Sequence, residues 1–334
     1  MNKPPKNDVF VQRTASFIDL QPTNESFEEA IICGLSGEKK SLPSKFFYDA
    51  RGSRLFDEIC VTPEYYPTRT EIGILAKIGS ELANMIPEHS QLIEFGAGNS
   101  TKVRLVLRAV QRFDSYVAID ISGEYLQKVA NELASDFPEI KVTALCADYT
   151  RLFELPDADH HDGPARVGFF PGSTIGNLTS EGAITFLRNI GHLLGDGAGF
   201  IVGADLLKDE KILLAAYNDS LGVTAAFNLN ILHRINRELE ANFVPEYFSH
   251  TAIFNPEKER MEMHLTSLRD QTVRLAGRDF HFAKDEAIHT ENSHKYTIKG
   301  FGELLEAAGH KPLKAWTDPE GLFSVHFARI GVAG

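Results

Sequence analysis

The chain has 334 residues, enough to bury a large core and to form two domains. Hydrophobic residues make up 43% of it, as in an ordinary globular protein, and 46 acidic residues against 34 basic ones give a formal net charge of −12. This charge disfavours a broad surface for nucleic acid or for an anionic membrane. No apolar run approaches the roughly 18 residues that span a bilayer. A small-molecule substrate is therefore the better expectation.

The cysteines and the N-terminus favour the cytoplasm. Cys33, Cys60 and Cys146 are far apart, without paired spacing for a metal site or a framework of disulfides. The first residues lack the apolar segment of a signal peptide. We therefore expect a protein of a reducing compartment, with residues 1–16 as a flexible tail.

The first third of the chain is mainly helical. The pattern predicts helices within residues 27–59 and again over residues 71–85. Between them, over residues 62–69, two prolines flank Tyr65 and Tyr66 and predict a rigid, non-helical connection. These tyrosines either pack against a neighbouring helix or point into a polar pocket.

Residues 91–120 organise the chain. An apolar strand, Leu92–Phe95, breaks at Gly96-Ala97-Gly98, a helix begins near Thr101, and a second strand ends on Asp120. In a parallel sheet both strand tips lie on the carboxyl edge, where a glycine turn admits a ligand and a carboxylate can bind ribose hydroxyls. This arrangement predicts a cofactor that contains a nucleoside.

The glycine turn favours S-adenosylmethionine over a dinucleotide. A dinucleotide site would have a third glycine where this chain has Thr101. Glu94, just before the turn, would suit a sulfonium group, and Asp148, which follows the strand 142–146, can reach an adenine amino group. A turn that merely connects a strand to a helix remains an alternative.

A second loop of small residues follows the next strand. Residues 167–170 are apolar, and the loop 171–177 ends on Asn177, whose amide offers both a donor and an acceptor. On the same sheet edge this loop would cover the far side of the cofactor crevice. His160 and His161 precede it in a polar segment that we interpret as a solvated loop, not a metal site.

The alternation of strands and helices stops after a strand that ends on Asp205. Two helices and a β-rich stretch, residues 250–290, intervene before the sheet resumes with a helix and a terminal hairpin. The predicted fold class is α/β, a Rossmann-like doubly wound sheet with an antiparallel edge hairpin, plus a second α+β domain. The expected ranges are 70–205 and 296–334 for the sheet domain, and 17–69 and 206–295 for the second domain.

Several long motifs, in the same order, identify a family. They are FYDARGSRLFDEI, TPEYYPTRTE, FGAGNSTK, GSTIGNLT, AYNDSLGVTAAFN, ENSHKY and WTDPEG. From about Phe17 to Ile330 the chain resembles the histidine Nα-methyltransferases that form hercynine on the way to ergothioneine. The resemblance implies a class I methyltransferase domain, S-adenosylmethionine as methyl donor, S-adenosylhomocysteine as product and no metal.

The resemblance also implies the site residues. The cofactor-binding positions would be Gly96, Lys102, Asp120, Asp148 and Tyr149. The substrate-binding positions would be Tyr48, Tyr65, Gly172, Asn177, Tyr217, Thr224, Met263, Glu291 and Ser293. Among these we expect catalytic roles for Asn177 and for Tyr48, which would orient the amine.

The implied residue types suit the chemistry. Glu291 and Ser293 lie on the same side of an extended segment and can hold opposite edges of an imidazole. Tyrosines and Asn177 can bind the amino-acid carboxylate without placing a cation beside the sulfonium. The aromatic faces of the tyrosines tolerate a trimethylammonium product. We expect in-line displacement by the neutral α-amine, in three rounds, with mono- and dimethylhistidine as intermediate substrates.

Three alternatives remain. The same fold could methylate another amino acid, such as tryptophan, or a histidine-derived thiol, although Glu291 and Met263 favour histidine. A regulatory protein that binds the cofactor without turnover is a different class, and a nicotinamide dehydrogenase is disfavoured by the missing glycine. We expect no nucleic-acid or membrane partner, and a monomer.

Overall fold

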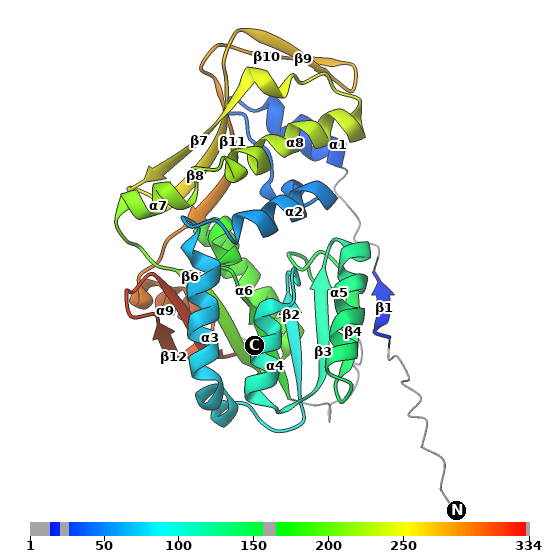
Figure 1. Ribbon diagram of the computed structural model, residues 1–334, viewed down its shortest axis with the longest axis vertical. Coiled ribbons are helices and arrows are strands. Elements are labelled where there is room, and N and C mark those ends of the chain that lie inside the picture. Colours follow the sequence, from blue (N-terminus) through cyan, green and yellow to red (C-terminus); the bar gives the residue numbers. More distant parts are fainter. Residues whose placement is uncertain (1–13, 21–26, 156–164, 332–334) are drawn as a thin grey trace, which may run out of the picture.

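The computed structural model describes residues 14–20, 27–155 and 165–331, and a large sheet lies in its lower half in Figure 1. Its eight strands have the order β1-β4-β3-β2-β5-β6-β13-β12. The strands from β1 to β6 are mutually parallel, and β13 is antiparallel to both of its neighbours. The predicted doubly wound sheet with an antiparallel edge hairpin is therefore confirmed. The strands are β1 (Ser16–Asp19), β2 (Ser90–Phe95), β3 (Phe113–Asp120), β4 (Lys141–Cys146), β5 (Arg166–Phe170), β6 (Gly199–Asp205), β12 (Lys311–Thr317) and β13 (Phe323–Arg329).

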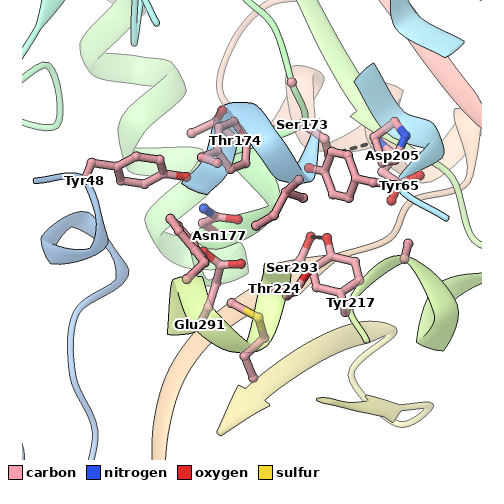
Figure 2. Close-up of a pocket in the computed structure, with 17 residues that line it drawn as sticks. Tyr48, Tyr65, Ser173, Thr174, Asn177, Asp205, Tyr217, Thr224, Glu291 and Ser293 are labelled. Carbon is pink, nitrogen blue, oxygen red and sulfur yellow. Dashed lines mark hydrogen bonds between the residues drawn. The ribbon is translucent and has the colours of Figure 1, made fainter. Parts of the chain in front are cut away.

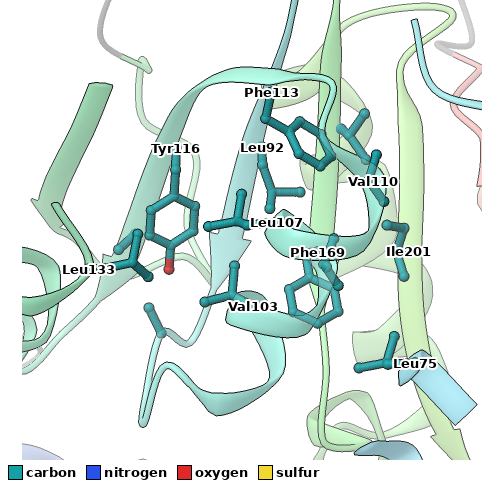
Figure 3. Close-up of a cluster of buried hydrophobic side chains, with 14 of the residues drawn as sticks. Leu75, Leu92, Val103, Leu107, Val110, Phe113, Tyr116, Leu133, Phe169 and Ile201 are labelled. Atoms are coloured by element: carbon teal, nitrogen blue, oxygen red, sulfur yellow. The ribbon is translucent and has the colours of Figure 1, made fainter. Parts of the chain in front are cut away.

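Helices cover both faces of this sheet, because successive residues of a strand point to opposite sides. Leu92 of β2 packs in one hydrophobic cluster with α3, α4 and α5 (Figure 3), and its neighbour Ile93 packs in another with α6 and α9. Burial on both faces explains why the parallel strands are continuous apolar runs. The helices are α3 (Tyr66–Met85), α4 (Thr101–Val110), α5 (Gly123–Asp136), α6 (Ser180–Leu194) and α9 (Ile298–Ala307).

A third hydrophobic cluster lies outside the large sheet. Most of the helices and strands that contribute to it lie in the upper part of Figure 1. Strands β11, β8 and β7 form an antiparallel sheet of their own, and β9 and β10 form a hairpin. The elements are α1 (Phe27–Ser36), η1 (Ser44–Phe47), α2 (Ala50–Ile59), α7 (Glu210–Ala216), α8 (Val223–Leu239), η3 (Pro245–Tyr247), β7 (Phe248–Asn255), β8 (Arg260–Ser267), β9 (Gln271–Leu275), β10 (Arg278–Phe282) and β11 (Ala287–His294). We propose that this cluster is the core of the second domain.

Two boundaries differ from the prediction. Residues 17–19 belong to β1, which pairs in parallel with β4, so they join the large sheet and not the second domain. A strand of four residues is too short to produce a periodic pattern in the sequence. Helix α3 begins at Tyr66, with Pro67 in its first turn, so the connection expected to be non-helical through Arg69 ends earlier. Proline is accepted there because the first N–H groups of a helix have no intrahelical partner.

The predicted tail, residues 1–16, is only partly testable. Residues 1–13 lie outside the described part of the chain, whereas Ser16 is already the first residue of β1. None of the described helices combines the length and the apolar character needed to cross a bilayer.

Side-chain caps fix two segments that carry the site. Asp49 accepts a 2.7 Å hydrogen bond from the backbone of Gly52 at the start of α2, directly after Tyr48. Thr179 makes the equivalent cap on α6, 3.1 Å long, two residues after Asn177. Because each cap satisfies a helix donor that would otherwise lack a partner, the chain just before each helix is held in place.

Candidate active site

A pocket lies between the large sheet and the third cluster, and Figure 2 shows its lining. About 590 Å³ of space lies within it, part of which is open to solvent. Segments far apart in the chain meet here. All nine residues that the sequence assigned to the substrate line the pocket: Tyr48, Tyr65, Gly172, Asn177, Tyr217, Thr224, Met263, Glu291 and Ser293.

Tyr48 forms one wall of the pocket and is backed by two phenylalanines. Its ring centroid lies 5.6 Å from that of Phe56 and 5.6 Å from that of Phe227, both edge-on. Burial raises the pKa of the Tyr48 phenol well above its ordinary value, and Glu291 and Tyr149 raise it further. The phenol is therefore neutral at physiological pH and can form hydrogen bonds without adding charge.

The adjacent tyrosines Tyr65 and Tyr66 do not both point into the pocket. Tyr65 lines the pocket, with its ring centroid 6.3 Å from that of Phe56. Tyr66 is buried, and its hydroxyl donates to Asp205 at 2.8 Å. One phenol thus faces the pocket, and the other holds the start of α3 against the end of β6.

The turn after β5 brings Asn177 close to β11. Gly172 has φ 84°, a left-handed conformation that glycine accepts without strain, and the chain then enters the short helix η2 (Thr174–Asn177). A Cβ on Gly176 would lie 2.9 Å from the carbonyl oxygen of His294. The close approach of η2 to β11 therefore requires glycine, and it places Asn177 beside Glu291 (Figure 2).

Glu291 and Ser293 lie two residues apart on β11 and both face the pocket. Met263 of β8 is the cross-strand partner of Glu291 and lines the pocket next to it. Burial raises the pKa of Glu291 to about 7, although Lys295 opposes the shift. A ligand group that donates a hydrogen bond to the ionised carboxylate would offset the cost of burying it.

A buried ionic network behind the pocket was not predicted from the sequence. The Lys295 ammonium donates to Asp205 at 2.6 Å and to the hydroxyls of Tyr217 and Ser293 at 2.9 Å each. Lys208 binds the other carboxylate oxygen of Asp205, also at 2.6 Å. Burial alone would raise the pKa of Asp205, but the two lysines outweigh it and lower the pKa. In the sequence, the one sign of this network was Lys295 in the ENSHKY motif, directly after the segment that forms β11.

The residues assigned to the cofactor lie at the carboxyl ends of β2, β3 and β4. Gly96 follows β2 with φ 74°, and a Cβ there would come within 3.3 Å of the Tyr149 hydroxyl. Asp120 ends β3, and burial raises its pKa to about 6. Asp148 follows β4 and accepts hydrogen bonds from the backbone and hydroxyl of Thr150. A ribose diol that donates to Asp120 would favour its charged form, so these residues fit a nucleoside cofactor.

Lys102, the fifth assigned cofactor residue, is held by a residue that the sequence did not reveal. Its ammonium lies 2.6 Å from the carboxylate of Glu71, which is buried. The same carboxylate accepts a 2.9 Å hydrogen bond from the backbone of Gly172. Glu71 thus joins the cofactor side to the pocket loop. In the sequence it is one acid among the polar residues of a predicted helix, and nothing marks it as buried.

The environment of Glu94 opposes the negative charge that the sequence placed beside the glycine turn. Glu94 is buried in β2, and the Tyr116 hydroxyl donates to it at 2.5 Å. Burial raises the pKa of Glu94 to about 8 and so favours its protonated form, whereas a nearby cation would favour the ionised form. The role of Glu94 beside a sulfonium stays a prediction.

The part of the chain that the structure describes contains no candidate metal site. Within residues 14–20, 27–155 and 165–331, no group of three or more histidine, cysteine or acidic side chains could hold a metal ion. All three cysteines, which belong to these residues, are unpaired. His160 and His161, expected in a solvated loop, lie outside the described residues.

Known proteins are similar in sequence to this chain over most of its length. Residues 27–330 match the family described as histidine-specific, SAM-dependent methyltransferases. The histidine N-alpha-methyltransferase of Mycolicibacterium smegmatis is 38% identical over 94% of this chain and 98% of its own length, and that of Mycobacterium tuberculosis is 38% identical over 89% and 93%. Ergothioneine biosynthesis protein 1 of Neurospora crassa is 30% identical over 83% of this chain and 32% of its own length. The chain therefore belongs to the family of histidine-specific, S-adenosylmethionine-dependent methyltransferases that its motifs indicated.

Proposed function

We propose that this protein transfers three methyl groups from S-adenosylmethionine to the α-amine of L-histidine, forming hercynine in the first step of ergothioneine biosynthesis. The observation that carries this proposal is Glu291, an acid with a raised pKa that faces the pocket without a cation from the described residues bound to it, whereas Asp205, the other carboxylate of the lining, is paired with Lys208 and Lys295. The relatives named for histidine methylation and for ergothioneine biosynthesis support the same substrate.

The pocket has separate groups for the two ends of histidine. Glu291 can accept a hydrogen bond from an imidazole N–H, and Ser293 beside it can bind the other ring nitrogen. Tyr48, Tyr65 and Asn177 line the same pocket and would bind the amino-acid group. An indole or a phenyl ring leaves Glu291 or Ser293 without a partner, which penalises these analogues.

The methyl donor would be held along the edge where β2, β3 and β4 end. Asp120 would bind the ribose hydroxyls, Asp148 and Tyr149 the adenine, and the turn at Gly96 with Lys102 the amino-acid end. When bound, the cofactor supplies a methyl group already activated by its sulfonium. We propose no metal for this step.

The protein's own contribution is alignment and the exclusion of water. Tyr48, with its raised pKa, orients the neutral α-amine and does not act as a base. Asn177, which lines the same pocket, also fixes the amino-acid group. The methylated amine must lose a proton before the second and before the third transfer. We assign that proton to water, while a nearby carbonyl can accept the hydrogen bond of the ammonium. Uncharged phenols beside the amine tolerate the trimethylammonium product.

The proposal extends to the protein's surroundings. Mono- and dimethylhistidine are substrates, S-adenosylhomocysteine is the second product, and the enzyme acts as a monomer without a nucleic-acid or membrane partner. Unpaired cysteines agree with a cytoplasmic enzyme.

The test is mass spectrometry of the products formed by the purified protein with S-adenosylmethionine and each of the twenty amino acids. We expect mono-, di- and trimethylhistidine to form in succession and no other amino acid to be converted at a comparable rate. A larger yield from tryptophan would replace histidine as the substrate, and no methylated product from any amino acid would overturn the proposal.

A further inference from the structure

Lys295 occupies an unusual position for a lysine, because its side chain is completely buried directly behind the pocket. Its three donors have three partners: the carboxylate of Asp205 and the hydroxyl oxygens of Tyr217 and Ser293. The ion pair with Asp205 raises the pKa of Lys295 despite its burial, so the ammonium form persists. All three of its hydrogen bonds therefore end on side chains that line the pocket.

Ser293 has no remaining acceptor capacity in this arrangement. Its oxygen receives one hydrogen bond from Lys295 at 2.9 Å and a second from the Tyr217 hydroxyl at 2.6 Å, which is drawn in Figure 2. A hydroxyl has two acceptor lone pairs and one donor hydrogen. Toward a ligand, Ser293 can therefore only donate. Glu291, when ionised, can only accept.

We propose that Lys295 is a positioning residue that sets this polarity, so that the pocket takes a neutral imidazole with its bare nitrogen at Ser293 and its N–H at Glu291. This inference rests on the proposed function and adds to it which form of the ring is bound. An imidazolium has two N–H groups and no bare nitrogen, so its second N–H would meet a hydroxyl that cannot accept. Without Lys295 the Ser293 hydroxyl is free to turn and loses its fixed direction.

A purely structural role for Lys295 is the competing explanation, and Lys208 provides the control for it. Lys208 lies on the opposite oxygen of Asp205, in the same buried network, and its ammonium also binds Tyr66. It does not line the pocket. If the role of Lys295 is only to stabilise the contacts around Asp205, removing either lysine should therefore have the same effect on substrate preference.

The experiment measures how strongly the enzyme prefers histidine to ring analogues that lack a bare nitrogen. In 3-(2-pyrrolyl)alanine and 3-(3-pyrrolyl)alanine the ring carries a single N–H, so each can satisfy Glu291 but gives Ser293 nothing to donate to. The ratio of kcat/KM for histidine to that for the better pyrrole is measured in wild type, Lys295→Met, Lys208→Met and Ser293→Ala. Affinity for S-adenosylhomocysteine reports whether each variant is folded.

Loss of one neutral hydrogen bond corresponds to about threefold to tenfold in this ratio. We expect Lys295→Met to lower the ratio by that factor, toward the value of Ser293→Ala, and Lys208→Met to leave it unchanged. In the Ser293→Ala background, Lys295→Met should have no further effect on the ratio, because the lysine acts through the serine. An unchanged ratio in Lys295→Met, or an equal fall in Lys208→Met, overturns the inference. So does a further fall in the double variant.

Two further variants keep the test decisive if Lys295→Met does not fold. Tyr217→Phe removes the other donor to Ser293 and leaves the ion pair intact, so it should lower the same ratio. Lys295→Arg keeps a cation for Asp205 and a donor for Ser293, so its ratio should lie between those of wild type and Ser293→Ala. If neither variant changes the ratio in the expected direction, the inference is overturned. Failure of the wild type to methylate histidine would instead overturn the proposed function itself.

Discussion

The two sides of the site are built in different ways. The cofactor side comes from neighbouring segments, because the turns after β2, β3 and β4 lie side by side on one sheet edge. The substrate pocket draws on α2, η2, α8, β8 and β11, which pack together only in the complete fold. Local chain geometry therefore places the cofactor groups, whereas long-range packing places the substrate groups. Glu71 connects the two sides through Lys102 and Gly172.

Among variants that should affect only one side of the site, we expect the largest loss of activity from Glu291→Ala. Removing the carboxylate should lower kcat/KM for histidine by about 100-fold or more, since sites built to hydrogen-bond a ligand discriminate by such factors. The discrimination against tryptophan should also relax, because the pocket becomes larger and no buried acid is left unpaired. Steady-state kinetics with both amino acids measure the change.

The control for Glu291→Ala is the affinity for S-adenosylhomocysteine by calorimetry, which should stay at the wild-type value. A variant that keeps the wild-type ratio of histidine to tryptophan would show that Glu291 does not recognise the imidazole. A large loss of cofactor affinity would show instead that the two sides are not separable.

The reciprocal variant, Asp120→Ala, should act on the cofactor side alone. Loss of charge-assisted hydrogen bonds to the ribose should weaken S-adenosylmethionine and S-adenosylhomocysteine by about 1–3 kcal/mol, or roughly 5-fold to 150-fold. Calorimetric titration of the folded variant measures the loss. The placement of the ribose at Asp120 is wrong if the affinity does not change.

A smaller effect is expected from pH, and it should also be confined to the substrate side. Burial raises the pKa of Glu291 to about 7, so its carboxylate is mostly protonated at pH 6 and mostly ionised at pH 8. The ionised form accepts an imidazole N–H in a stronger, charge-assisted hydrogen bond than the protonated form, and its population rises about tenfold over this interval. Histidine affinity should therefore increase with pH in wild type more steeply than in Glu291→Gln.

The measurement is the dissociation constant of histidine in the presence of S-adenosylhomocysteine, from pH 6 to pH 8. Protonation of histidine itself contributes equally in wild type and variant, so the difference between the two profiles isolates Glu291. Parallel profiles would show that the carboxyl group does not titrate in the binding step.

The sequence by itself determined the sheet, the glycine turn and the acids at the strand ends. Each of these follows from a pattern within a few residues, such as an apolar run that ends on Gly96 or on Asp120. The substrate residues were recognised only through motifs shared with a family, since no local pattern links Tyr48 to Glu291. Tertiary structure alone decided the states of the buried charges. Burial raises the pKa of Glu94, Glu71 pairs with Lys102, and Lys295 is buried against Asp205, because burial and charge partners depend on which distant segments pack around each group.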